Sequence, residues 1–335
     1  MRGLAWPPLS PLRHRACRLL ATLLLGGCTM AWAGLDAPGH EAGVLTDGVA
    51  FSPPPADRGP VEVPPVRRPE GVDLAISLDQ QIYDMLAEDL RDYADTHRLR
   101  VALQRGTCGQ SFAGLRDHRI DIGGFCCPPG PEDRLPGVRF HTLGIASLAI
   151  VTHPRSPLGD LPRSRLQAIM AGTLRQLPLG ADGAPVTLFP VVRLHCASRP
   201  GHWRLILPEE EQFFPLATPV AGIGEMLRNV GRYLGAIGYE TLYWIDKEAP
   251  DLKILTIDGL SPRDRRALLH GSYPYYRVFN LTTWTGAAAD PRAQELVAWL
   301  MQRFAARASA AGAVPAAELR AAGWRFADDE LVGPP

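Results

Sequence analysis

The chain has 335 residues, with 35 basic and 35 acidic side chains and a formal net charge of zero at pH 7. Apolar residues make up 46% and charged residues 21%, which is typical of a folded globular protein rather than a disordered one. Because the charge is balanced, no bulk attraction to nucleic acid or to an anionic membrane surface is expected.

The first 33 residues have the features of an export signal, which predicts a periplasmic protein. An arginine-rich leader precedes a short apolar run at residues 19–25, which is too short to span a membrane. Two cleavage patterns compete. Residues 25–28 (LGGC) resemble a bacterial lipobox, in which Cys28 would carry a lipid, whereas residues 31–33 (AWA) fit ordinary signal peptidase. Only the first pattern would attach the protein to a membrane.

Residues 34–70 are rich in proline, which disfavours both helix and sheet. Such a segment is typical of a semi-rigid spacer, and we expect it to hold a folded domain away from a membrane. The alternative is a tail without a role of its own.

From residue 71 onward, strand and helix patterns alternate. Strands are expected at 72–76, 98–103 and 120–122, with helices over about 82–93 and 112–115 between them. This βαβαβ order predicts a mostly parallel sheet with crossover helices.

The alternation continues to the end of the chain, and about 265 residues are long for a single sheet, so we expect two lobes. The later strands are expected at 148–152, 186–192, 235–239, 253–257 and 276–281, and the later helices around 166–170, 226–234 and 296–304.

Four cysteines beyond the signal follow expected strands. They are Cys108, the adjacent pair Cys126 and Cys127, and Cys196. Ligands of α/β proteins bind at the turns that follow strands. If these three turns converge, the four thiols belong to one site.

Three interpretations of the thiols stay open. In an oxidising compartment, Cys108 could form a disulfide with Cys126 or Cys127. Alternatively, three or four thiolates, with His195 or His141, could bind Cu(I), Zn(II) or a thiophilic species such as arsenite. The thiols could also be buried and inert.

Nothing in the sequence indicates catalysis or a resident cofactor. The HExxH, GxSxG, Walker and dinucleotide-binding motifs are absent from the sequence. His195 and Cys196 are adjacent, and their side chains would point to opposite faces if they continue the strand, which argues against a dyad unless the strand has already ended. We therefore expect a binding protein rather than an enzyme.

The order of motifs from residue 72 to about 328 resembles the PstS-like, phosphate-binding family of type II periplasmic solute-binding proteins. Five segments are similar to family motifs and occur in the family's order. They are GTCG with RIDIG between residues 106 and 123, VTHPRSPL at 151–158, LQAIMAG at 166–172, GAIGY at 235–239, and YP at 273–274 with the strand that begins at Arg277.

The resemblance implies an α/β fold of the type II periplasmic-binding-protein class, with two lobes around a ligand cleft and closure by a hinge. One lobe would hold residues 71–149 and about 275–328, and the other residues 150–274. The implied function is to bind a small oxyanion such as phosphate and to pass it to an ABC permease or report it to a membrane sensor.

The resemblance also implies ligand-binding residues. Ser77 and Leu78 take the place of a Thr-Phe pair, Thr107 that of a serine, and Arg193 that of the anion-binding arginine. Each has a simpler alternative, because Ser77 and Thr107 could cap helices and Arg193 could be a surface residue. The full set is Ser77, Leu78, Thr107, Cys108, Gly109, Cys126, Cys127, Arg193, Cys196, Ala197 and Ser198.

The departures from the family fall on the same turns. Cys126 aligns with the aspartate that accepts a hydrogen bond from protonated phosphate, Cys196 begins the turn that follows the arginine, and Cys108 replaces a glycine. A thiophilic ligand, bound by the cysteines with or without His195, is therefore the alternative to phosphate. A third possibility is a lipoprotein that kept the fold, binds no ligand and acts through protein contacts.

Overall fold

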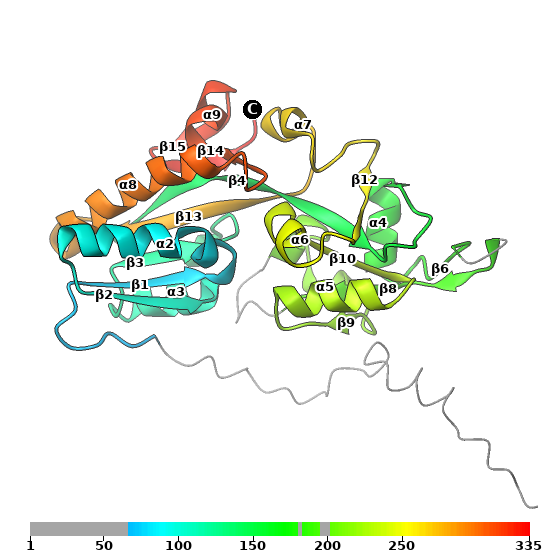
Figure 1. The fold of residues 1–335 in the computed structure, drawn as a ribbon, viewed down its shortest axis with the longest axis horizontal. Helices are drawn as coiled ribbons and strands as arrows, with labels where there is room; N and C mark the ends of the chain where they lie inside the picture. Colours follow the sequence, from blue (N-terminus) through cyan, green and yellow to red (C-terminus); the bar gives the residue numbers. More distant parts are fainter. Residues whose placement is uncertain (1–65, 180–182, 195–201) are drawn as a thin grey trace, which may run out of the picture. The chain divides into compact units, whose positions relative to one another are not determined.

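The structure is a computed structural model that describes residues 66–179, 183–194 and 202–335 (Figure 1). All of them belong to one unit, Leu45–Pro335. The segment expected to be an export signal, with Cys28, the proline-rich segment up to residue 65, and residues 195–198 lie outside the described residues. Within the described part, no helix is long and apolar enough to cross a bilayer.

The first part of the fold is a parallel βαβαβ arrangement, as expected. Strand β1 (Leu74–Asp79) lies between β2 (Val101–Gly106) and β3 (Ile122–Phe125), with helices α2 (Gln80–His97) and α3 (Cys108–Arg116) as the crossovers. Each strand begins two or three residues later than predicted.

Both crossover helices have clear start signals immediately after a strand. The Asp79 side chain accepts a hydrogen bond from the Gln81 N–H and caps α2. Thr107 caps α3 in a reciprocal capping box with Gln110. Because the strands end where the helices begin, the capping residues lie at the carboxyl edge of the sheet.

Two long antiparallel strands continue the sheet. Strand β4 (Val138–Thr152) pairs with β13 (Tyr276–Trp284) and then with β10 (Ala236–Thr241), which is parallel to β8 (Phe189–Val192). The strand order is β2-β1-β3-β13-β4-β10-β8-β9 among the described residues, where β9 is the short strand Thr218–Pro219 (Figure 1). The sequence predicted only the last five residues of β4, because its first half mixes polar and apolar side chains.

The remaining α-helices and strands include three separate two-stranded sheets, formed by residues 160–161 with 256–257, 176–177 with 186–187, and 325–327 with 330–333. These remaining elements are β5 (Asp160–Leu161), α4 (Arg163–Met170), β6 (Gln176–Leu177), β7 (Val186–Thr187), β9 (Thr218–Pro219), α5 (Ile223–Arg232), α6 (Leu242–Glu248), β11 (Lys253–Ile254), β12 (Thr256–Ile257), α7 (Arg265–Leu269), α8 (Pro291–Arg307), β14 (Ala313–Pro315), α9 (Ala316–Ala321), β15 (Arg325–Ala327) and β16 (Glu330–Gly333).

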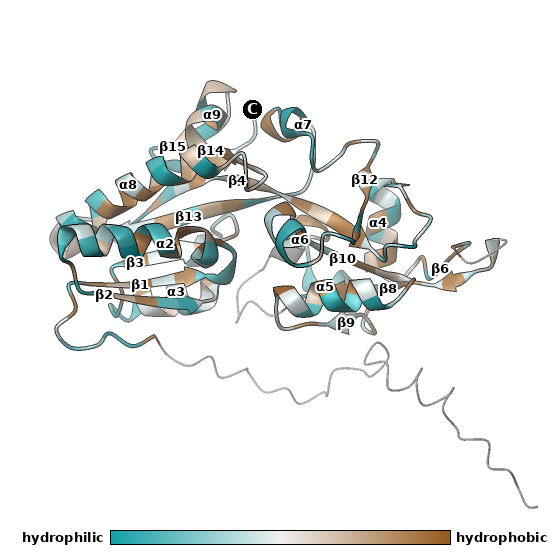
Figure 2. Ribbon diagram, viewed as in Figure 1, coloured by the Kyte–Doolittle hydropathy of each residue, from teal (hydrophilic) through white to brown (hydrophobic). Residues whose placement is uncertain are grey.

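Two large hydrophobic clusters share the long strands. Phe140 and Leu143 of β4 pack in one cluster with β1, β3, α2 and α8, whereas Leu148 and Ile150 pack in the other with β10, α4 and α5. The chain therefore passes from one cluster to the other within β4. Figure 2 shows hydrophobic stretches along β4 and β13, while α2 and α5 also carry hydrophilic residues.

Candidate functional site

Three of the four cysteines meet at the carboxyl edge of the parallel strands. Cys108 begins α3 directly after β2, and Cys126 and Cys127 follow β3. Their sulfur atoms all lie within 4.8 Å of one another. The Cys108 and Cys126 Sγ atoms are 3.6 Å apart, and those of Cys126 and Cys127 are 3.7 Å apart. The three side chains are buried, and we call them the thiol centre.

The thiol centre is not cross-linked internally. Cys108, Cys126 and Cys127 are recorded as thiols, and their separations far exceed the about 2.0 Å of an S–S bond. The backbone N–H of Cys126 donates to Cys108 Sγ at 3.3 Å, which ties the turn after β3 to the start of α3. Cys196, the fourth expected thiol, lies outside the described residues.

Asp79 lies beside the thiol centre and was missed by the sequence analysis. It ends β1, the strand between β2 and β3, and its Oδ2 atom is 3.6 Å from Cys108 Sγ. Burial, together with the negative charge of Cys126, raises the pKa of Asp79 to about 8. The carboxyl group is therefore mostly protonated at pH 7. The sequence did contain a signal for Asp79, because it is a polar residue between a buried strand and a helix pattern.

Arg277 was expected only as a strand residue, but it contacts the thiol centre. It lies on β13 with 0% exposure, and its Nη1 donates to Cys126 Sγ at 3.5 Å. Its Nη2 donates to Glu240 Oε1 at 3.1 Å. Burial opposes the charged form, but the carboxylate of Glu240 and the charge on Cys126 raise the pKa of Arg277, so it stays cationic.

Arg193, the expected anion-binding residue, is buried and paired with a carboxylate. It follows β8 directly, and its Nη2 lies 3.4 Å from Glu240 Oε2. Its backbone N–H donates to the hydroxyl of Tyr239 at 3.0 Å. Arg193 is therefore not the surface residue of the simpler alternative, because only 3% of it is exposed.

The electrostatics of the thiol centre favour a thiolate at Cys126 over one at Cys108. Hydrogen bonds from Cys108 and Cys127 lower the pKa of Cys126, and the guanidinium groups of Arg277 and Arg193 add to this effect. Hydrogen bonds of Cys108 with Cys126 and Cys127, together with burial, raise the pKa of Cys108, which keeps its proton. The proton therefore stays on Cys108, next to the thiolate of Cys126, which the two arginine cations stabilise.

The other predicted site residues have local contacts. The Ser77 carbonyl and hydroxyl both pair with the Ser111 hydroxyl, and Leu78 is part of a hydrophobic cluster. Thr107 caps α3, and Gly109 lies in the first turn of that helix. Thr107 therefore acts as a helix cap in the structure, which was the simpler alternative to a ligand-binding role.

His141, an optional metal ligand in the sequence analysis, contacts other residues. Its Nδ1 lies 3.1 Å from Asp329 Oδ2 and its Nε2 lies 2.8 Å from Thr283 Oγ1. The group of potential metal ligands found in the described part of the chain holds the three cysteines without it. His195 lies outside the described residues.

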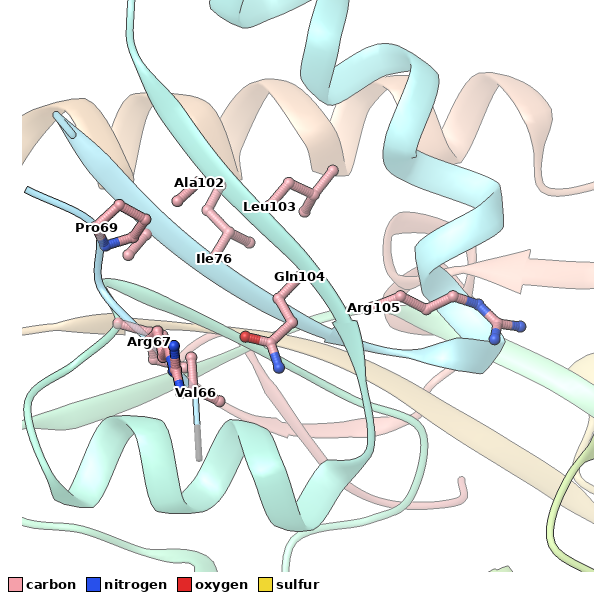
Figure 3. A pocket seen from close by; sticks show the side chains of 10 residues that line it. Val66, Arg67, Pro69, Ile76, Ala102, Leu103, Gln104 and Arg105 are labelled. Atoms are coloured by element: carbon pink, nitrogen blue, oxygen red, sulfur yellow. The ribbon is translucent and has the colours of Figure 1, made fainter. Parts of the chain in front are cut away.

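Two surface hollows lie away from the thiol centre. One, of about 420 Å³, runs along β1 and β2 and is lined by residues that include Val66, Ile76, Gln104 and Arg105 (Figure 3). The other, of about 490 Å³, is lined by the chain around Arg175. Neither lining includes a cysteine, so the thiol centre does not form the wall of either hollow.

Comparison with known proteins identifies the fold. No protein-family model and no curated protein sequence matches the chain. Among solved structures, the ABC-type phosphate transport receptor from Vibrio cholerae matches with a TM-score of 0.59 and 19% identity, covering 72% of this chain and 99% of that one. A protein from Clostridium perfringens, assigned as a phosphate ABC transporter substrate-binding protein and holding phosphate, matches with a TM-score of 0.62 and 15% identity, covering 72% and 98%.

These matches confirm the expected fold class. The chain has the mixed α/β fold of type II periplasmic binding proteins. At identities below 20%, the likeness extends to the fold alone. What the thiol centre does must therefore be argued from its own residues.

Proposed function

We propose that this protein is a non-catalytic binding protein whose thiol centre takes a small thiophilic ligand, with a soft metal ion such as Zn(II) or Cu(I) as the best fit. The observation that carries this proposal is the presence of three cysteine sulfurs within 4.8 Å of one another. Thiolates are the ligands that these ions prefer.

The spacing of the sulfurs suits one bound ion. A metal–sulfur bond of about 2.3 Å places two sulfurs of a tetrahedral site roughly 3.8 Å apart. The two separations at Cys126 are 3.6 and 3.7 Å. Asp79 Oδ2, at 3.6 Å from Cys108 Sγ, is within reach as an oxygen ligand after a small movement. The site thus needs little rearrangement to hold an ion.

The charges around the centre also suit a cation bound by thiolates. One Zn(II) with three thiolates carries a net charge of −1. Adding the carboxylate of Glu240 and the cations Arg193 and Arg277, which pair with it, brings the total to zero while Asp79 keeps its proton, and to −1 when Asp79 also binds the ion as a carboxylate. A buried cluster of zero net charge avoids the large free-energy penalty of an unpaired buried charge.

A phosphate-like oxyanion is the second candidate. Two buried guanidinium groups, Arg193 and Arg277, lie at the centre, and guanidinium groups suit oxyanions. Both are already paired with Glu240, and a further anion would leave excess negative charge in a buried place. The oxyanion is therefore the weaker fit.

The fold and the start of the chain suggest how the ligand would be used. The N-terminal residues are those of an export signal, with Cys28 as the lipidation site if the lipobox is processed. A periplasmic binding protein of this fold would pass its ligand to an ABC permease or report it to a membrane sensor. If no ligand binds, the third possibility applies, a lipoprotein that acts through protein contacts.

Calorimetry on the reduced protein tests the proposal. We expect one equivalent of Zn(II) or Cu(I) to bind, and the affinity to fall at least tenfold in Cys126→Ser. His270→Ala, which removes an exposed imidazole, should bind the metal like the wild type. Arsenite is titrated as a second thiophilic ligand, and phosphate and sulfate are titrated to test the oxyanion alternative. Phosphate binding without metal binding would overturn the proposal in favour of the second candidate.

A further inference from the structure

We propose that the carboxylate of Glu240 fills an anion-binding site built into this protein and thereby excludes free oxyanions from the thiol centre. Glu240 would be the specificity-determining residue that prevents free oxyanions from binding. This inference goes beyond the proposed function, because it holds whether or not the cysteines bind a metal.

The donors around Glu240 form the surroundings expected for a bound oxyanion. Oε1 accepts hydrogen bonds from Arg277 Nη2 at 3.1 Å, Gln81 Nε2 at 2.8 Å and the Thr241 N–H at 2.8 Å. Oε2 pairs with Arg193 Nη2 at 3.4 Å. Two guanidinium groups, an amide and a backbone N–H thus converge on one carboxylate. The same kinds of donors recognise free carboxylates and phosphates.

These donors come from distant parts of the chain. Gln81 lies in the first turn of α2, Arg193 follows β8, Arg277 lies on β13, and Thr241 ends β10 next to Glu240. Gln81 is itself held in place by the hydroxyl of Thr241, 3.1 Å from its Oε1. Four parts of the chain therefore form a binding site around the carboxylate of Glu240, which belongs to the chain itself.

Burial makes the carboxylate hard to displace. Glu240 and Arg277 are 0% exposed, and Gln81 is 1% exposed. A free anion could reach the guanidinium groups only if the Glu240 carboxylate left them, and a buried carboxylate without partners is strongly disfavoured. An attached carboxylate also needs no loss of translational freedom, unlike a free anion. The wild-type protein should therefore refuse phosphate and sulfate.

Shortening Glu240 tests this directly. In Glu240→Ala, the donors remain while the carboxylate and its space are released. We expect the variant to melt at a lower temperature than the wild type, and formate or acetate to restore several degrees. Chloride at the same ionic strength should restore less, because it cannot accept from the donors as a planar group. Melting temperatures measured in phosphate and in sulfate show how large an anion the released space accepts.

A second ion pair provides the matched control. Glu330 pairs with Arg134, whose side chain is 49% exposed, so its loss leaves a cation that water can solvate. Glu330→Ala should therefore show no specific gain from formate or acetate. If Glu240→Ala does not fold, Glu240→Ser releases most of the same space with a small polar side chain, and added formate should stabilise it more than it stabilises the wild type.

Two results would overturn the inference. One is tight phosphate or sulfate binding by the wild type with Glu240 in place, and the other is a folded Glu240 variant that gains nothing from any of these anions. Absence of metal binding by the wild type would contradict the proposed function but leave this inference standing, so the two failures are distinguishable.

Discussion

At the scale of single residues, the thiol centre separates groups that hold a proton from groups that do not. Cys126 is held as the thiolate by its hydrogen bonds and by two arginines, whereas Cys108 and Asp79 keep their protons. A metal ion would replace those protons, because it binds thiolates and carboxylates only in their ionised forms. Metal affinity should therefore rise with pH.

Asp79 makes the metal-free protein less stable as the pH rises. Its pKa is about 8 in the folded state and 3.8 as the ordinary value. Between these values the folded state binds more protons than the unfolded state, so stability falls with rising pH. Asp79→Asn removes this term and keeps a helix-capping side chain. We expect it to raise the free energy of unfolding on the order of 5 kcal/mol at pH 8 and little near pH 4.

Urea denaturation of the metal-free protein at pH 4.5 and pH 8 measures this effect. Asp264→Asn is the control, because Asp264 caps α7 at an exposed position. The same pH dependence of stability in Asp79→Asn and in the wild type would contradict the assignment.

At the scale of the elements, the parallel register of β1, β2 and β3 creates the site. All three strands end at one edge, where Asp79, Cys108 and Cys126 follow them. Close packing of β3 on β1 depends on Gly124, since a Cβ atom there would lie 2.6 Å from Leu78 Cδ2 and 2.7 Å from Ile82 Cδ1. Gly124 therefore leaves room for the side chains of Leu78 and Ile82 beside the strand that precedes Cys126.

Gly124→Ala should displace the side chains of Leu78 and Ile82 and thereby disturb the neighbouring thiol centre. We expect a loss of stability of about 1–3 kcal/mol, as for other overpacked cores, together with weaker Zn(II) binding. Gly159→Ala is the control, because no atom lies within 4 Å of the added Cβ. Chemical denaturation and a zinc titration of both variants provide the comparison. Unchanged zinc affinity in Gly124→Ala would show that the packing around Gly124 does not determine the geometry of the thiol centre.

The sequence predicted this edge of the sheet but not all of its residues. The order of strands and helices placed Cys108, Cys126 and Cys127 after parallel neighbours, so their convergence could be foreseen. Arg277 and Glu240 could not be, because each reaches the site from a strand that gives no local sign of it. Their contacts depend on β13 and β10 pairing with β4.

At the scale of the whole molecule, the site draws on both hydrophobic clusters. The hydrogen bond from Gln81 to Glu240 joins residues separated by 159 positions, and the pair of Arg277 with Glu240 joins β13 to β10. A donated hydrogen bond from Arg204 to the carbonyl of Pro128 adds a further link beside Cys127. The order of five motifs along the chain was enough to foresee the fold, whereas this network needed the folded structure.

Because the site joins distant parts of the chain, a bound metal should stabilise the whole fold. Binding to the folded state alone contributes about 2.7 kcal/mol when the free ligand is 100 times its Kd. We expect Zn(II) to raise the melting temperature of the reduced protein, a chelator to reverse the effect, and Cys126→Ser to abolish it. An equal rise in Cys126→Ser would place the metal elsewhere.

X-ray absorption spectroscopy of the reduced protein with one equivalent of Zn(II) tests the central claim most directly. The thiol centre predicts a first coordination shell of three sulfur atoms at about 2.3 Å, completed by one light atom. Cys126→Ser should lower the number of sulfur neighbours. A shell of nitrogen and oxygen atoms only would contradict the proposal that the three cysteines form the binding site.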